Sequence, residues 1–270
     1  MATYHAGDLL PADRPAPNPG GAPAITATGI VKRYGHLEAL RGASIDLHPG
    51  EVVALVGDNG AGKSTLTKVI CGAIPADAGE LSFWGEPTRV QSIHHAHELG
   101  VHTVYQDLAL APHLSVADNL FLGREPIPTG WRSLLGVLDR RRMIDQTREA
   151  MSRLGITLRD YTVPVGDLSG GQRQALAVAR AITWATTAVL MDEPTAALGP
   201  KQSAIVYETV TAAAERGLAV LVISHDIPQM LHVADRIAVM RHGTVVAVRE
   251  ARSMRLPDVI GLMLGEEVTA

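Results

Sequence analysis

The eight residues 57–64 constrain the fold of this chain more than any other feature. They fit the pattern G-x-x-x-x-G-K-[ST] at every fixed position, directly after an apolar run at residues 52–56 and before a segment of helical character. Glycines at these positions let successive N–H groups turn inward, which makes a cradle for an anion at a helix N-terminus. The alternative is a Gly-rich turn with a structural role only. We expect these ligands for the anion: Gly57, Asp58, Asn59, Gly60, Ala61, Gly62, Lys63, Ser64 and Thr65.

Apolar runs predict strands on both sides of this turn. The early runs are short and are joined by turns that contain Gly and Pro. After residue 64, helices and strands alternate, which is typical of a parallel sheet covered by helices. Three later runs have the length and composition of buried parallel strands, and residues 107–184 are mostly helical in pattern. The expected strands are residues 25–31, 43–47, 51–56, 80–84, 188–191, 218–223 and 237–240.

Composition limits the classes of protein to consider. Aromatic residues make up only 4% of the 270 residues, so the core must be built from Val, Ile, Leu and Ala. A net charge of -4 gives no reason to expect a nucleic-acid surface.

No apolar stretch approaches the ~20 residues of a membrane-spanning helix, and the N-terminus lacks a signal-peptide pattern. Residues 1–24 are rich in Pro, Ala and Gly and are expected to be a disordered tail. Cys71, the single cysteine, excludes an internal disulfide and is expected in the core.

Three other segments allow a functional interpretation that the sequence does not favour. The histidine cluster at residues 94–97, with His102 nearby, has no carboxylate or cysteine at a familiar spacing for a metal site, so a solvated helix face is expected. The three arginines at 140–142 are expected at a solvated helix start, with a phosphate or lipid-headgroup contact as the alternative. Residues 126–138, which include Trp131, are interpreted as a loop insertion.

Two acids follow the predicted strand at residues 188–191. A buried strand that ends in Asp192 and Glu193 leaves both carboxylates at its C-terminal edge, where ligands bind in α/β sheets. Together with a phosphate cradle, Asp192 and Ser64 are expected to bind Mg²⁺, Lys63 to bridge the β- and γ-phosphates, and Glu193 to orient or deprotonate the attacking water. The alternative is an acidic pair that caps a helix.

A second possible cradle follows, in the sequence Leu168-Ser169-Gly170-Gly171-Gln172. Paired glycines after a serine, at the start of a helix expected over residues 173–182, form another site for phosphate oxygens. One nucleotide does not need two such cradles from one chain, so we expect the second to close over ATP bound to another copy. This string, downstream of the first motif, resembles the signature of the ABC transporter ATPase family.

The resemblance covers residues 25–265 and implies roles for three further residues. Tyr34 matches the aromatic that stacks on adenine, Gln106 matches the glutamine that senses Mg²⁺ and the reacting water, and His225 matches the γ-phosphate histidine. Gln106 also begins the segment expected to contact the membrane subunit. Gly199 departs from the family, which commonly has Asp there, and this puts in doubt how tightly two sites in a dimer communicate.

The resemblance also implies an architecture. It is an α/β fold with a P-loop NTPase (RecA-like) core, an N-terminal antiparallel β subdomain and an inserted α-helical signature subdomain at about residues 107–184. The whole cassette domain spans residues 25–265, and residues 266–270 form a C-terminal tail.

Within the family, the stretches at residues 105–110 and 114–125 look like those of single-cassette bacterial monosaccharide importers of the fructose and ribose type. This implies an ATP hydrolase that uses ATP and Mg²⁺ and works at the cytoplasmic face of the membrane. Its implied partners are a second copy, transmembrane permease subunits and, indirectly, an extracytoplasmic sugar-binding protein, with no nucleic acid. Three alternatives are an importer ATPase for another solute, a non-transport ABC ATPase acting on DNA ends or ribosomes, and a regulatory subunit that binds ATP without turnover.

Overall fold

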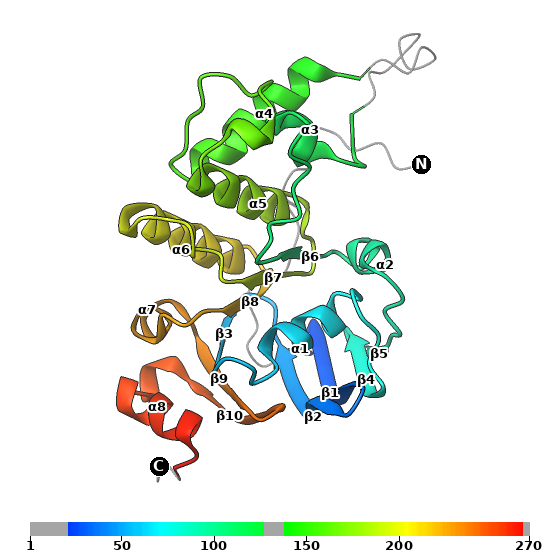
Figure 1. Ribbon diagram of the computed structural model, residues 1–270, viewed down its shortest axis with the longest axis vertical. Helices are drawn as coiled ribbons and strands as arrows, with labels where there is room; N and C mark the ends of the chain where they lie inside the picture. Colours follow the sequence, from blue (N-terminus) through cyan, green and yellow to red (C-terminus); the bar gives the residue numbers. More distant parts are fainter. Residues whose placement is uncertain (1–20, 127–137, 267–270) are drawn as a thin grey trace. The chain divides into compact units, whose positions relative to one another are not determined.

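The computed structural model describes residues 21–126 and 138–266 (Figure 1). Most of the expected N-terminal tail, loop insertion and C-terminal tail lies outside the described residues. The chain divides into two compact units. The larger contains residues 21–103, 185–194 and 210–266, and the smaller contains residues 104–184 and 195–209.

An antiparallel sheet forms the first part of the larger unit. Its strand order is β2-β1-β4-β5, and each neighbouring pair is antiparallel. Buried side chains of β1 mostly alternate with partly or fully exposed ones, as expected when one face of a sheet covers a core. The strands are β1 (Ile25–Tyr34), β2 (Leu37–Leu47), β4 (Ala78–Phe83) and β5 (Glu86–Pro87).

A second sheet has the strand order β10-β9-β3-β8-β7-β6. The central pairs β9·β3, β3·β8 and β8·β7 are parallel, and every residue of β3, β7 and β8 is buried. Burial on both faces explains the continuous Val, Ile and Leu runs, so the prediction of buried parallel strands is confirmed. The strands are β3 (Val52–Val56), β6 (Val101–Val104), β7 (Ala188–Asp192), β8 (Ala219–Ile223), β9 (Arg236–Arg241) and β10 (Thr244–Glu250), the last antiparallel to β9.

Three helices of the larger unit lie between strands in the chain, and a fourth, α8, follows β10. They are α1 (Lys63–Ile70), α2 (Ile93–Glu98), α7 (Ile227–Val233) and α8 (Leu256–Leu264). Cys71 directly follows α1 and is buried, as expected. Among the described residues, none of the helices combines the length and the apolar character needed to cross a bilayer.

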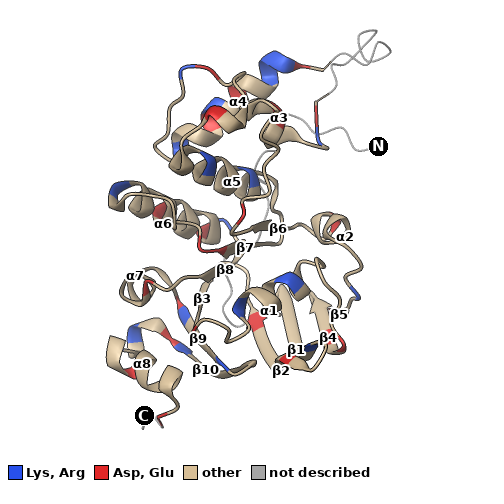
Figure 2. Cartoon of the chain, viewed as in Figure 1, with Lys and Arg blue, Asp and Glu red and all other residues tan. Residues whose placement is uncertain are grey.

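The smaller unit is mainly helical. In it, α3 (Val116–Phe121), α4 (Arg140–Arg153) and α5 (Gly170–Trp184) pack against one another around buried Met143, Met151 and Tyr161. The arginines at 140–142 form the first turn of α4, at a helix start as expected, and Figure 2 shows basic residues there. Helix α6 (Pro200–Glu215) begins in this unit.

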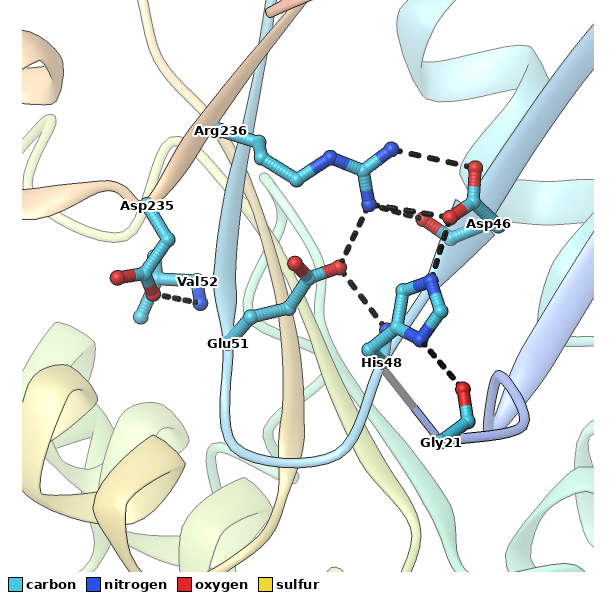
Figure 3. Close-up of polar contacts among 7 residues, drawn as sticks. All are labelled: Gly21, Asp46, His48, Glu51, Val52, Asp235 and Arg236. Carbon is cyan, nitrogen blue, oxygen red and sulfur yellow. Dashed lines mark hydrogen bonds and ion pairs between the residues drawn. The ribbon is translucent and has the colours of Figure 1, made fainter. Parts of the chain in front are cut away.

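A charged cluster ties the two sheets of the larger unit together (Figure 3). The guanidinium of Arg236, at the start of β9, contacts carboxylate oxygens of Asp46 on β2 at 3.1 Å and of Glu51 at 2.9 Å. His48 Nε2 lies 2.7 Å from Asp46, and the backbone N–H of Val52 donates to Asp235. The N-terminal end of β3 is therefore fixed by these side-chain contacts as well as by the backbone hydrogen bonds of the sheet.

The structure corrects one detail of the histidine cluster. His94 is exposed on α2, as expected. His102, however, lies in β6 and is buried, and the centre of its ring is 4.2 Å from the centre of the stacked His97 ring. Across residues 21–126 and 138–266, no three His, Cys, Asp or Glu side chains gather so that they could hold a metal ion.

Candidate functional site

The turn between β3 and α1 has a backbone that only glycine can form at two positions. Gly57 has φ 151°, and a Cβ there would lie 2.1 Å from the carbonyl oxygen of Met240. Gly62 has φ 107°, and its Cβ would lie 2.8 Å from the carbonyl oxygen of Ala39. Asp58, Asn59 and Gly60 between them are exposed to solvent. The turn is thus packed at both ends and open in the middle, which suits a cradle for phosphate at the N-terminus of α1.

The ammonium of Lys63 lies within this turn. Its Nζ donates hydrogen bonds to the carbonyl oxygens of Gly57 at 2.7 Å and Asp58 at 2.9 Å. Burial lowers the pKa of this ammonium from its ordinary value of 10.5, and the charges of Asp192, Glu193 and Asp58 partly oppose that effect. A partly desolvated cation beside carboxylates is well placed to exchange carbonyl partners for phosphate oxygens.

Asp192, Glu193 and His225 share one edge of the parallel sheet. Asp192 ends β7 and is buried, Glu193 follows it, and His225 follows β8, which lies between β7 and β3 in the sheet. His225 Nδ1 lies 3.2 Å from Glu193 Oε1. Glu193 has φ 52°, and its N–H donates to the carbonyl of Ile223 at 3.0 Å. Sheet order therefore brings the turn at residues 57–64 and these three side chains to the same edge.

Tyr34 ends β1 in the same unit, and 47% of its surface is exposed. The Nζ of Lys32 lies 5.9 Å from the centre of its ring and forms an ion pair with Asp77. An exposed ring held at the end of a strand can stack on a planar ligand.

In the smaller unit, Ser169 and Gln172 cap the N-terminus of α5 reciprocally. The N–H of Gln172 donates to Ser169 Oγ at 3.3 Å, and the N–H of Ser169 donates to Gln172 Oε1 at 2.9 Å. This is the capping box expected from a Ser followed three residues later by Gln. Gly170 and Gly171 form the first turn, and a Cβ on Gly171 would lie 3.2 Å from Leu198. The first turn of α5 is therefore held by its own capping side chains, and its two glycines leave the backbone N–H groups without neighbouring Cβ atoms.

Gln106 is exposed in a turn that follows β6, in the smaller unit. The backbone N–H of Leu108 donates to the carbonyl of Tyr105 and closes this turn. Leu108 and Ala109 have φ of 62° and 45°, which the sequence did not indicate because neither is glycine.

The structure thus gathers the predicted residues into two groups. Lys63, Asp192, Glu193, His225 and Tyr34 belong to the larger unit, and Gln106 and the cradle at residues 169–172 belong to the smaller one. The sequence did not reveal the Glu193–His225 contact, because it depends on β7 and β8 being neighbours. Arg180 was also missed, although an arginine within the apolar helix at residues 175–182 was a signal.

The residues present fit a nucleotide with Mg²⁺. Ser64 and Asp192, both in the larger unit, would be the protein ligands of the ion. Mg²⁺ usually binds one or two protein oxygens together with phosphate oxygens and water, so a preformed three-carboxylate cage is not required.

Comparisons with known proteins agree with this geometry. The family model described as ABC transporter matches residues 40–196. The fructose import ATP-binding protein FrcA of Rhizobium meliloti is 46% identical over 249 residues, which cover 90% of this chain and 94% of FrcA. The ribose import ATP-binding protein RbsA of Jannaschia sp. strain CCS1 is 39% identical over 253 residues, which cover 94% of this chain and 48% of RbsA. This chain therefore spans nearly all of the fructose relative and about half the length of the ribose relative.

Among solved structures, the ADP conformation of an ATP-binding cassette of an ABC transporter is 26% identical to this chain. It matches with a TM-score of 0.73 over 90% of this chain and 99% of the cassette. The expected α/β fold class and the family resemblance are confirmed.

Proposed function

The chain belongs to the ABC transporter family, and from this premise we propose that it binds and hydrolyses ATP to power monosaccharide import through separate permease subunits. The observation that carries the proposal is the shared sheet edge: the glycine turn with Lys63 lies there with Glu193 and His225, whose side chains are 3.2 Å apart. The names of the fructose and ribose relatives support sugar as the imported class.

The site residues have distinct roles in this reaction. Tyr34 stacks on the adenine, and the N–H groups of residues 57–64 hold the phosphates. Lys63 leaves its carbonyl partners and neutralises charge on the transferring phosphoryl group. Bound Mg²⁺ supplies further neutralisation of that charge.

Glu193 is the group that orients the attacking water and accepts its proton. His225 contacts one oxygen of this carboxylate, and Glu193 N–H is fixed to the carbonyl of Ile223, so the carboxylate is held at the end of β7. A carboxylate fixed in this way costs less reorganisation when the water reacts.

The second cradle supports a dimer as the working state. The N-terminus of α5, with Ser169 at its rim, is a separate phosphate site from the turn at residues 57–64. Two copies arranged head to tail use both cradles on each ATP. Permease subunits hold the pair at the cytoplasmic face of the membrane, and an extracytoplasmic sugar-binding protein delivers the solute.

The test has two stages. The purified protein is assayed for phosphate release from ATP with and without Mg²⁺, with Glu193→Gln as the matched control. Proteoliposomes that contain the permease are then assayed for ATP-driven uptake of fructose, ribose and xylose in the presence of the binding protein. Release that depends on Mg²⁺ and Glu193, with uptake of at least one sugar, supports the proposal. Absence of Mg²⁺-dependent phosphate release by the native protein refutes the ATPase role, and absent uptake of every sugar refutes the monosaccharide role.

A further inference from the structure

The turn that displays Gln106 is strained and is held from outside. Leu108 and Ala109 both have a left-handed backbone, which L-residues other than glycine adopt at a conformational cost. Such a conformation persists only when the surrounding structure stabilises it. The closing hydrogen bond, from Leu108 N–H to Tyr105, does not fix the direction of the next two carbonyl groups.

One guanidinium holds both of those carbonyls. Nη2 of Arg180 donates to the carbonyl of Leu108 at 3.1 Å and to that of Ala109 at 2.9 Å. Burial lowers the pKa of Arg180 below its ordinary value, because the guanidinium is partly removed from solvent. Hydrogen bonds from a charged donor are stronger than neutral ones, so Arg180 restrains the orientation of both carbonyl groups.

The residues that follow this turn, from Ala111 to Leu114, are held by a different side chain. Asn119 on α3 is fully buried; its Oδ1 accepts from Ala111 N–H, and its Nδ2 donates to the carbonyls of Ala111 and Leu114. Loss of Arg180 therefore frees the turn up to about residue 110 and leaves the following segment in place.

Arg180 also belongs to α5, the helix that opens with Ser169 and the second cradle. Figure 2 shows basic residues along this helix. The turn that displays Gln106 is thus fixed to the same helix as the second cradle, within the smaller unit.

We propose that Arg180 is a positioning residue that acts through Gln106: it holds the strained turn at Leu108 and Ala109 and so fixes Gln106 relative to the helix that carries the signature. This role rests on the proposed ATPase function.

The first experiment is a double-substitution cycle on ATP hydrolysis. Arg180→Met should lower kcat about tenfold, the loss expected for one or two charged hydrogen bonds, and should raise the Mg²⁺ concentration for half-maximal rate. Its KM for ATP should stay within about twofold, because residues 57–64 are untouched. Combined with Gln106→Ala, it should add little to the loss that Gln106→Ala causes alone, because both changes act through one group. Multiplied losses in the double variant would overturn the proposal.

Arg236→Met is the matched control. Arg236 is also a partly buried arginine with two acceptors, but it lies in the charged cluster of the larger unit. Its loss should lower the Tm without changing the Mg²⁺ requirement, and its effect on kcat should multiply with that of Gln106→Ala. If Arg180→Met behaves in the same way as this control, Arg180 is structural only.

The second experiment needs no hydrolysis. Amide hydrogen exchange should rise at residues 105–110 in Arg180→Met and stay native at residues 111–121. Ala109→Gly, which removes only an exposed methyl and relieves the left-handed strain, should restore part of the kcat lost in Arg180→Met. Arg180→Lys, the variant to use if Arg180→Met does not fold, should show an intermediate exchange rate. Unchanged exchange at residues 105–110 in these variants would overturn the proposal. A native protein that releases no phosphate would refute the ATPase function, and the exchange result would still decide whether Arg180 holds the turn.

Discussion

Nδ1 of His225 and Oε1 of Glu193 lie 3.2 Å apart, although 32 residues separate them in the chain. The contact exists because β8 and β7 are neighbours with parallel pairing from Ala188 to Asp192. It is asymmetric, because 78% of the His225 side chain but only 29% of the Glu193 side chain is exposed. The carboxylate is therefore the sheltered partner, and the imidazole is the one free to meet a ligand.

Replacement of Glu193 by Gln tests the sheltered partner. The amide cannot accept a proton from water, so hydrolysis should fall at least about a hundredfold while ATP binding is retained. The measurements are phosphate release and nucleotide affinity, and an ATP-bound dimer should accumulate on a sizing column. Hydrolysis near the native rate would show that Glu193 is not the base.

Replacement of Lys63 by Ala should act on binding instead. The ammonium neutralises phosphate charge directly, and its loss also leaves the carbonyls of Gly57 and Asp58 without this donor. Affinity for ATP should fall about tenfold or more, as measured by titration calorimetry. Lys68→Ala, at the other end of α1, is the control and should bind ATP as the native protein does.

Ser169→Arg tests whether the second cradle serves a neighbouring copy. Alone, Ser169→Arg and Lys63→Ala proteins should both be inactive. A mixed dimer has one site lacking both residues and one site with native Lys63 and native Ser169, so phosphate release should reappear on mixing. Permease subunits can be added to hold the pair together. If mixed dimers are demonstrated by pull-down but no activity returns, the cradle does not act across a dimer with independent sites.

The ionic cluster around Arg236 predicts how stability depends on pH. Burial raises the pKa of Asp46, but hydrogen bonds and charge from Arg236, together with His48, outweigh it, so the pKa lies below its ordinary 3.8. The ionised carboxylate therefore contributes stability in full above about pH 4, and this contribution is lost as the pH falls through the lowered pKa.

Asp46→Asn should reduce the free energy of unfolding by about 1 kcal/mol at pH 7, a modest value because solvent screens this partly exposed carboxylate. Urea unfolding at pH 7 and at pH 3 should show a smaller difference between native and variant proteins at the lower pH. Glu149→Gln, in an exposed ion pair with Arg153, is the control and should change little at either pH. An equal difference at both pH values would contradict the cluster's role.

The backbone of Gly199 does not require glycine, in contrast to that of Gly57, and a side chain there needs only a small shift of Gln202. The φ of Gly199 is not in the left-handed region, its carbonyl accepts the N–H of Ser203, and a Cβ would meet only the side chain of Gln202 at 3.1 Å. It is thus the N-cap of α6, where Asp is preferred over Gly by a few tenths of a kcal/mol.

Gly199→Asp should therefore raise the Tm slightly, whereas Gly57→Ala should lower it because a Cβ would strike the carbonyl of Met240. Differential scanning calorimetry of both variants checks this pair of outcomes. A marked fall in Tm for Gly199→Asp would show that the position needs glycine.

Local patterns in the sequence were sufficient for several elements. The order of β3, the glycine turn and α1 followed from adjacent residues, because an apolar run, glycine spacing and a helical period are properties of neighbours. The buried strands β7 and β8 were predicted for the same reason. The end of β7 placed Asp192 and Glu193 at a strand terminus before any coordinates, whereas Tyr34, Gln106 and His225 were indicated by the resemblance to the family.

Tertiary structure alone decided which of these residues meet. The contact of Glu193 with His225 depends on strand order, the burial of His102 depends on what packs on β6, and the hold of Arg180 on Leu108 and Ala109 joins residues 71 and 72 positions apart. Leu108 and Ala109 adopt a left-handed backbone that the distant guanidinium of Arg180 stabilises. No pattern in the neighbouring sequence indicates this conformation. Sequence patterns report the short-range energies of each segment, whereas these contacts arise from free energy gained only when distant segments pack together.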